Sequence, residues 1–177
     1  MHPLKRTMFW INIIGGIAVI GSYVWGFKAI PDAGSVLWGS LPENLRRVST
    51  AWMPLAALGY FLFTYLLLFR LNPDQSQIAG RFGFAAFNWL YALILAPSAL
   101  WMPLSAWALQ NPIAARVWVV RLILWLVALA SLLLIAALLS LHPRAPALAY
   151  GLAVAGSVAL AVQTVIMDAI LWVAYFP

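Results

Sequence analysis

Long apolar stretches, separated by short polar or proline-containing segments, dominate the chain. A helix that crosses a membrane needs about 20 mostly apolar residues, and five stretches meet that requirement. They are residues 8–27, 51–71, 84–109, 118–141 and 148–176. Because lipid offers no partner for unpaired backbone groups, helices are the simplest solution for such stretches. We therefore predict an all-α fold, an integral membrane bundle of five transmembrane helices that forms a single membrane domain over residues 1–177.

The segments between the stretches predict how the helices are connected. Proline and asparagine mark three short connections, Asn72-Pro73-Asp74, Asn111-Pro112 and His142-Pro143-Arg144. Helices joined by such short loops are expected to be antiparallel neighbours. The first loop, residues 28–50, is the long one, and residues 42–47 within it are a candidate short helix.

Composition excludes several classes of protein. Apolar residues make up 66% of the chain and charged residues 8%, against about 45–50% and about 25% in soluble domains. A soluble enzyme, a nucleic-acid-binding domain and a disordered chain are therefore excluded. The net charge of +6 comes from scattered Lys and Arg near the ends of the apolar stretches, where cations reach lipid headgroups. We expect membrane lipid, and no nucleic acid, as the partner of these charges.

Membrane orientation does not follow from the charges. We call the side of the N-terminus side A and the opposite side, which holds the long first loop, side B. Five of the ten Lys and Arg residues are assigned to each side, so the excess of positive charge that marks cytoplasmic loops is missing. The prediction is a multi-pass membrane protein of undetermined orientation.

The ten tryptophans are distributed unevenly. Seven are predicted near side B: Trp25, Trp38, Trp52, Trp101, Trp107, Trp118 and Trp172. A similar motif occurs twice near the same side, as residues 49–55 (STAWMPL) and residues 98–104 (SALWMPL). One interpretation is an aromatic-lined cavity under the first loop. The alternative is an uneven aromatic belt combined with ordinary packing, since Trp is favoured at membrane interfaces.

Asp168 is the one acid well inside an apolar stretch. Ionisable groups at such positions are costly and are candidates for function. At α-helical spacing Asp168 shares a face with Thr164 and Trp172. Arg121 on the fourth helix is a candidate partner, and the other candidates are Arg116 and the loop pair Arg46 and Arg47. Asp168 is then either a packing contact between helices or an anchor for the polar end of a ligand. A proton relay would need further acids or histidines along a path, and none is evident.

The architecture and part of one motif resemble the tryptophan-rich sensory protein/translocator protein (TspO/MBR) family. That family has a Trp-x-Pro-Pro element entering its second helix, and the matching place here reads Trp52-Met53-Pro54-Leu55, with one proline kept. Trp38 corresponds to the family's loop tryptophan, and Gln163, Thr164 and Asp168 to its polar fifth helix. The resemblance implies a pocket beneath the first loop that binds flat hydrophobic ligands such as tetrapyrroles or sterols, often in a homodimer.

The leading hypothesis is an integral membrane protein that binds or transports a flat hydrophobic ligand in an aromatic-lined pocket. The predicted ligand-binding residues are Trp38, Trp52, Pro54, Trp101, Trp107, Trp118, Arg121, Thr164, Asp168 and Trp172. A tetrapyrrole is the candidate bound group, and neither a metal site nor a catalytic residue is predicted. The alternative is a small structural or accessory subunit of a larger membrane complex. A membrane enzyme is the third hypothesis, and it would have very few catalytic groups to use.

Overall fold

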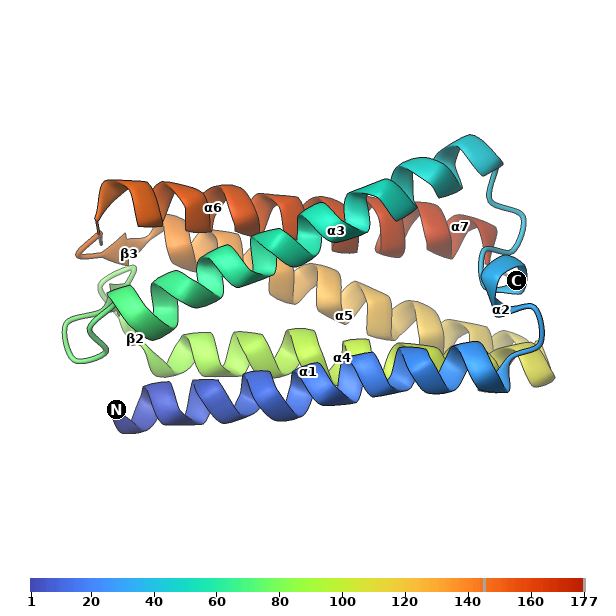
Figure 1. Cartoon of the computed structure of the whole chain (residues 1–177), viewed down its shortest axis with the longest axis horizontal. Helices are drawn as coiled ribbons and strands as arrows, with labels where there is room; N and C mark the ends of the chain where they lie inside the picture. Colours follow the sequence, from blue (N-terminus) through green and yellow to red (C-terminus); the bar gives the residue numbers. More distant parts are fainter. Residues whose placement is uncertain (145, 177) are drawn as a thin grey trace.

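The computed structural model describes residues 1–144 and 146–176, and nearly all of them lie in helices (Figure 1). Five helical segments are long and apolar enough to span a membrane. They are α1 (Pro3–Ala29), α3 (Glu43–Tyr65) continued by η1 (Leu66–Arg70), α4 (Ala85–Gln110), α5 (Ala114–Leu139), and α6 (Ala147–Ala161) continued by η2 (Val162–Trp172) and α7 (Val173–Tyr175). The prediction of an all-α bundle with five membrane-spanning helices is confirmed.

The helices form a ring whose order differs partly from the prediction. α1 packs on α4, α4 on α5, α5 on α6 and η2, and α6 on α3. The prediction that helices joined by short loops are neighbours is confirmed for α4–α5 and α5–α6. The second and third spans do not pack along each other, because α3 packs along α6 and crosses the bundle at an angle (Figure 1), and they meet where side chains of α3 contact Tyr91 of α4. α3 and α1 therefore diverge toward side B and approach each other through η1 at side A.

A close backbone contact explains why α3 prefers α6. Gly59 of α3 lies against Gly156 of α6, and a Cβ atom added to either residue would collide with the backbone of the other. Small residues allow membrane helices to approach this closely, which increases van der Waals contact where no hydrophobic effect drives association. This glycine pair sets where the two helices cross.

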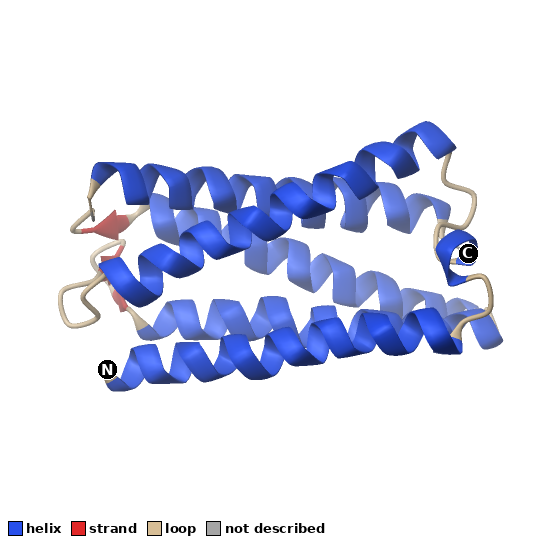
Figure 2. Cartoon of the chain, viewed as in Figure 1, coloured by secondary structure: helices blue, strands red, loops and turns tan. Residues whose placement is uncertain are grey.

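The two ends of the bundle are closed differently (Figure 2). At side A, three two-residue strands form a small antiparallel sheet in the order β2-β1-β3, from β1 (Gln77–Ile78), β2 (Phe82–Gly83) and β3 (Leu141–His142). This sheet joins the loop before α4 to the loop after α5. At side B lies the one-turn helix α2 (Ala33–Val36).

The first loop is shorter than predicted. The sequence analysis places it at residues 28–50 with a separate short helix at 42–47, whereas α1 continues to Ala29 and α3 begins at Glu43. Pro42 directly precedes the helix, a position where a missing N–H is harmless. Glu43 accepts a hydrogen bond from Arg47 at 2.6 Å, four residues later, and such pairs support an exposed helical turn. Residues 42–47 are therefore the start of the second span.

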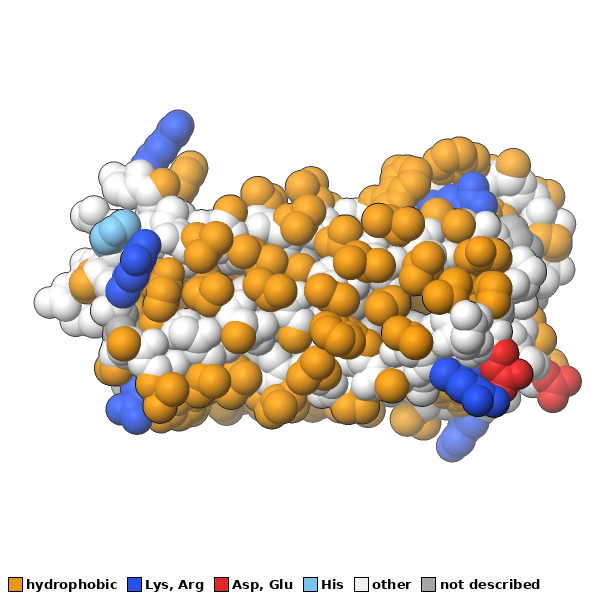
Figure 3. Space-filling view, turned by 90° about the horizontal axis from the view of Figure 1, so that it is seen from above, with side chains coloured by type: hydrophobic (Ala, Val, Ile, Leu, Met, Phe, Trp, Pro, Cys, Tyr) orange, Lys and Arg blue, Asp and Glu red, His pale blue; other side chains and the backbone are white. Residues whose placement is uncertain are grey.

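Side chains on the outside match a membrane location. On the face shown in Figure 3, hydrophobic side chains cover the length of the bundle, and Lys, Arg, His and acidic side chains gather at its two ends. Large apolar residues are exposed along the spans, among them Ile17, Ile20 and Trp89. In water this surface would be unfavourable, but in lipid it is expected.

Hydrogen bonds connect helices inside the half of the bundle nearer side A. The Tyr60 hydroxyl donates to Oδ1 of Asn12 on α1, and Thr64 and Tyr91 share a hydrogen bond of 2.8 Å between α3 and α4. Both contacts lie among buried aromatic rings, where Tyr60 and Tyr91 have centroids 5.7 Å apart.

Replacing Tyr60 with phenylalanine removes the bond to Asn12 and keeps the ring. We expect a loss of about 0.6 kcal/mol in the free energy of unfolding, the average for polar contacts between membrane helices. Thermal unfolding in detergent would measure this as a decrease of a few degrees at most. A decrease in melting temperature as large as that caused by removing a whole buried ring would contradict this prediction, because the Tyr60 hydroxyl would then contribute more than one hydrogen bond.

Candidate functional site

A cavity of about 630 Å³ lies at side B, under α2 and among all five spans. It exists because α1 and α3 diverge toward this side while α4, α5 and η2 form the wall behind them. Its lining is largely apolar, with Met53 from α3, Met102 from α4 and Leu124 and Val127 from α5. Ligand pockets in proteins are typically about 300–1,000 Å³ and mostly apolar, so the cavity has the size of a ligand site.

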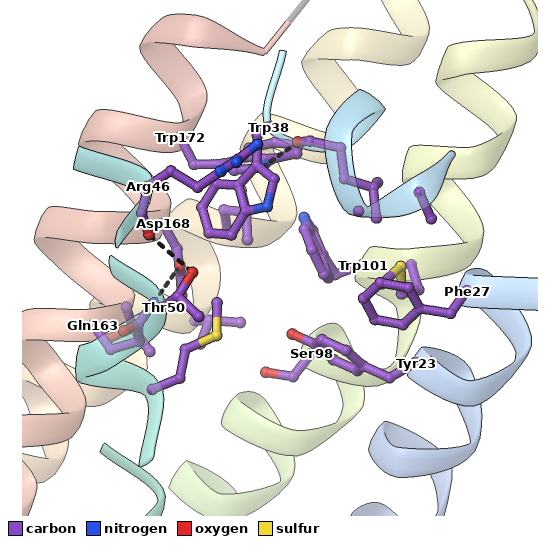
Figure 4. A pocket seen from close by; sticks show the side chains of 18 residues that line it. Tyr23, Phe27, Trp38, Arg46, Thr50, Ser98, Trp101, Gln163, Asp168 and Trp172 are labelled. Carbon is purple, nitrogen blue, oxygen red and sulfur yellow. Dashed lines mark hydrogen bonds between the residues drawn. The ribbon is translucent and has the colours of Figure 1, made fainter. Parts of the chain in front are cut away.

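Three of the aromatic side chains that line the cavity are tryptophans from three separate segments (Figure 4). Trp38 comes from the loop after α2, Trp101 from α4 and Trp172 from the end of η2. The Trp101 ring lies 5.5 Å from Trp172, edge to face, and 5.4 Å from Tyr23 of α1. These contacts fix the ring orientations and leave the aromatic surfaces facing a shared space.

The loop over the cavity is attached to the end of the fifth span. Trp172 donates from Nε1 to the Leu37 carbonyl at 2.7 Å, and the Ser40 amide donates to the Tyr175 carbonyl at 3.1 Å. Gly39 has φ of +54° and lies against the Tyr175 backbone, where a Cβ would collide. Glycine adopts this backbone conformation without penalty. The structure therefore requires glycine at this position for the loop to reach its anchor.

Three polar residues of the lining, Gln163, Thr164 and Asp168, lie on η2, a π-helical segment. Gln163 donates from Nε2 to Oδ1 of Asp168 at 2.8 Å, across five residues. In a π-helix the backbone repeats at i→i+5, so residues five apart become neighbours, whereas in an α-helix they point in different directions. π-helical turns are frequent at functional sites. Thr164, beside them, donates to the Leu160 carbonyl at 3.1 Å.

Five of the ten predicted ligand-binding residues line the cavity. They are Trp38, Trp101, Thr164, Asp168 and Trp172. The structure brings these residues together from the first loop, the third span and the fifth span.

The other five predicted residues lie elsewhere. Trp52 faces α6, where its Nε1 donates to the Ala159 carbonyl at 2.9 Å, and Pro54 is exposed one turn into the predicted span. The Arg116 guanidinium lies over the Trp107 ring, with Cζ 4.6 Å from the ring centroid, and the Arg121 guanidinium lies over the Trp118 ring at 5.3 Å. Both indoles are exposed on the outside of the bundle, because a position near side B does not determine which way a helix face points.

The predicted pairing of Asp168 with Arg121 is wrong. No Lys, Arg or His nitrogen of the described residues lies within 4.0 Å of the Asp168 carboxylate. The Arg121 guanidinium lies over the Trp118 ring instead, and its Nε is buried without a hydrogen-bond partner among the described residues. The face of the indole attracts this cation, whereas an apolar bundle interior would not.

Other lining residues are not among the ten predicted ligand-binding residues. Tyr23 and Phe27 reach the cavity from α1, and Arg46 and Thr50 from the first turns of α3. Arg46, an alternative candidate partner of Asp168 in the sequence analysis, lines the cavity because α3 begins at Glu43. The repeated motif gave a usable signal, since Met53 in the first copy and Ser98, Trp101 and Met102 in the second line the cavity.

The cavity lining contains few ionisable side chains. Among the described residues that line the cavity, Asp168 is the one acid and no histidine is present. The described residues also contain no group of three His, Cys, Asp or Glu that could hold a metal ion. A pocket with apolar walls and a few placed polar groups orients a ligand.

Comparison with known proteins gives no relative from which a function could be transferred. No family model, no curated protein and no solved structure matches the chain. The cavity and its side chains therefore carry the functional proposal.

Proposed function

We propose that this membrane protein binds, and in doing so stores or transports, a flat hydrophobic ligand of the tetrapyrrole or sterol type. The observation that carries the proposal is the cavity of about 630 Å³ in which Trp38, Trp101 and Trp172 meet beneath the first loop. Aromatic side chains stack on planar ligands and supply much contact area with little loss of conformational freedom. The resemblance to the TspO/MBR family supports the same ligand class and the same place under the loop.

The exposed tryptophans favour a second candidate function. Trp118 and Trp125 form an edge-to-face pair on the outside of α5 and are 48% and 41% exposed. Such a face can pack on partner helices, as in an accessory subunit of a larger membrane complex or in a homodimer. Purification in mild detergent separates these possibilities: a fixed heterologous partner in constant ratio supports the subunit, and an isolated monomer or dimer that binds ligand supports the first proposal.

Titration with protoporphyrin IX tests the first proposal. We expect saturable quenching of tryptophan fluorescence by the purified protein in detergent. Trp101→Leu removes a stacking surface from the cavity wall and is expected to weaken binding about tenfold, which corresponds to 1.4 kcal/mol. Stacking of one ring is worth about 0.5–1.5 kcal/mol beyond the buried area.

Trp89→Phe is the matched control, since Trp89 is 73% exposed and lies outside the cavity. Its affinity should equal that of the unmodified protein. Quenching that rises linearly without saturation, or that weakens equally in both variants, would indicate partition into the micelle and contradict binding in the cavity.

A further inference from the structure

We infer that the cavity selects ligands with a positive charge, so that its preferred ligands are hydrophobic amines with a planar apolar body. This inference rests on the proposed function and specifies the chemistry of the ligand's polar end. It is carried by the acceptors on η2, by the position of the indoles and by the distribution of charge around the cavity.

Asp168 presents a carboxylate whose hydrogen-bonding capacity is largely unused. An ionised carboxylate has two oxygens with about four acceptor positions. The described residues provide one hydrogen bond, from Gln163, and no cation within 4.0 Å. An unpaired charge in a low-dielectric interior is unfavourable, so this carboxyl group lacks the partner that would stabilise its ionised form. A cation supplied by the ligand would stabilise the carboxylate and complete this site.

Gln163 provides a second acceptor beside the carboxylate. Its Nε2 donates a hydrogen bond to Asp168, while its Oε1 is buried and has no hydrogen-bond partner among the described residues. A buried acceptor without a hydrogen bond costs about 1–3 kcal/mol. A protonated primary amine carries three donors and a hydroxyl carries one. The amine can therefore bind the Asp168 carboxylate and the Gln163 carbonyl at the same time, and a hydroxyl cannot.

The aromatic lining favours a cation as well. The Trp172 ring belongs to the same segment as Asp168, and Trp38 and Trp101 line the same cavity. Indole faces attract cations, with the strongest effect where water is excluded. The walls that would stack on the ligand's apolar body are thus compatible with a positive charge at its end.

Arg46 adds a positive charge to the lining. It is the Lys or Arg side chain among the described lining residues, it is half-buried on the first turns of α3, and it reaches toward Trp38 in Figure 4. Its nitrogens lie more than 4.0 Å from the Asp168 carboxylate, and its charge disfavours an ammonium directly beside the guanidinium. A cationic ligand is therefore expected to place its amine at the acceptors on η2 and away from this guanidinium.

A matched pair of ligands tests the inference. Cholesterol and 3β-aminocholest-5-ene share one ring system and differ in a hydroxyl or an amine at C3. We expect the purified protein in detergent to bind the amine at least tenfold more tightly, measured by displacement of protoporphyrin IX. Asp168→Asn keeps the side-chain shape and removes the charge, so the ratio of the two affinities should fall to near one.

Asp74→Asn is the matched control, because Asp74 lies at side A and contacts His2. It should keep the amine preference in full. Gln163→Leu removes the second acceptor and should reduce the preference for the amine about threefold, which gives a second test if Asp168→Asn does not fold.

The outcomes separate the inference from the proposed function. Equal affinities of the unmodified protein for both sterols, or tighter binding of cholesterol, would overturn the inference and leave the proposed function standing. Failure to bind either sterol or protoporphyrin IX would overturn the proposed function. Loss of both sterols in Asp168→Asn, with unchanged thermal stability, would show that Asp168 shapes the cavity and does not select charge.

Discussion

The Gly156→Ala variant is expected to unfold in detergent about 2–12 °C below the unmodified protein. The added Cβ would overlap the carbonyl oxygen and Cα of Gly59 on the facing helix, and these backbone atoms cannot move aside as a flexible side chain can. Overpacking in a tight interior costs about 1–3 kcal/mol, and each kcal/mol lowers the melting temperature of a chain of this length by about 2–4 °C. Scanning fluorimetry on the intrinsic tryptophans would measure the change.

Gly151→Ala is the control for this experiment. Gly151 lies on α6 as well, and a Cβ there meets open space. Alanine has the higher helix propensity, so this variant should be as stable as the unmodified protein or slightly more stable. Equal melting temperatures for Gly151→Ala and Gly156→Ala would show that α3 and α6 do not cross at Gly59 and Gly156.

Trp172→Ala should remove both the loop anchor and the ligand site. The indole is 4% exposed and stacks on Phe176 with ring centroids 4.0 Å apart. It also packs on Trp101 and donates a hydrogen bond to the Leu37 carbonyl. Truncating a buried tryptophan costs about 3–5 kcal/mol. We expect a melting temperature lower by about 10 °C or more, rapid proteolysis between α2 and α3, and no saturable binding of protoporphyrin IX.

Trp172→Phe separates the hydrogen bond from the packing. It keeps a ring against Phe176 and deletes the N–H that reaches Leu37, so the loss should be about 1 kcal/mol. Proteolysis of the loop should then increase with little change in overall stability. If Trp172→Ala leaves proteolysis of this loop unchanged, the contacts of Ser40 and Gly39 with Tyr175 are sufficient to hold it.

The spans could be predicted because the membrane imposes a simple requirement on sequence. About 20 consecutive apolar residues stand out in any chain, and all five stretches found this way are helices in the structure. The start of α3 was placed too late, because Glu43 and Arg47 made its first turns look like part of a polar loop. The neighbours of α3 were also missed, since the contact of Gly59 with Gly156 depends on two positions nearly 100 residues apart.

The site could be predicted less completely. Near side B, sequence position gave the depth of each tryptophan but not the direction of its ring, so Trp101 and Trp118 looked equivalent although one lines the cavity and the other is outside. Asp168 was identified because charge is rare within apolar stretches. Its bond with Gln163 was not, because α-helical spacing separates residues five apart and nothing in the sequence marks a π-helix.

The wide turns of η2 give the site room for one extra residue. Between Gln163 and Asp168 the chain has one residue more than an α-helix needs to bring two side chains together. Deleting one lipid-facing position there, such as Ile166, would let the segment shorten into a regular α-helix. Gln163 and the aspartate would then be four residues apart and would remain neighbours on one helix face. A single-codon deletion in this stretch is therefore a change by which a related chain could narrow the helix and still keep the carboxylate beside its amide donor.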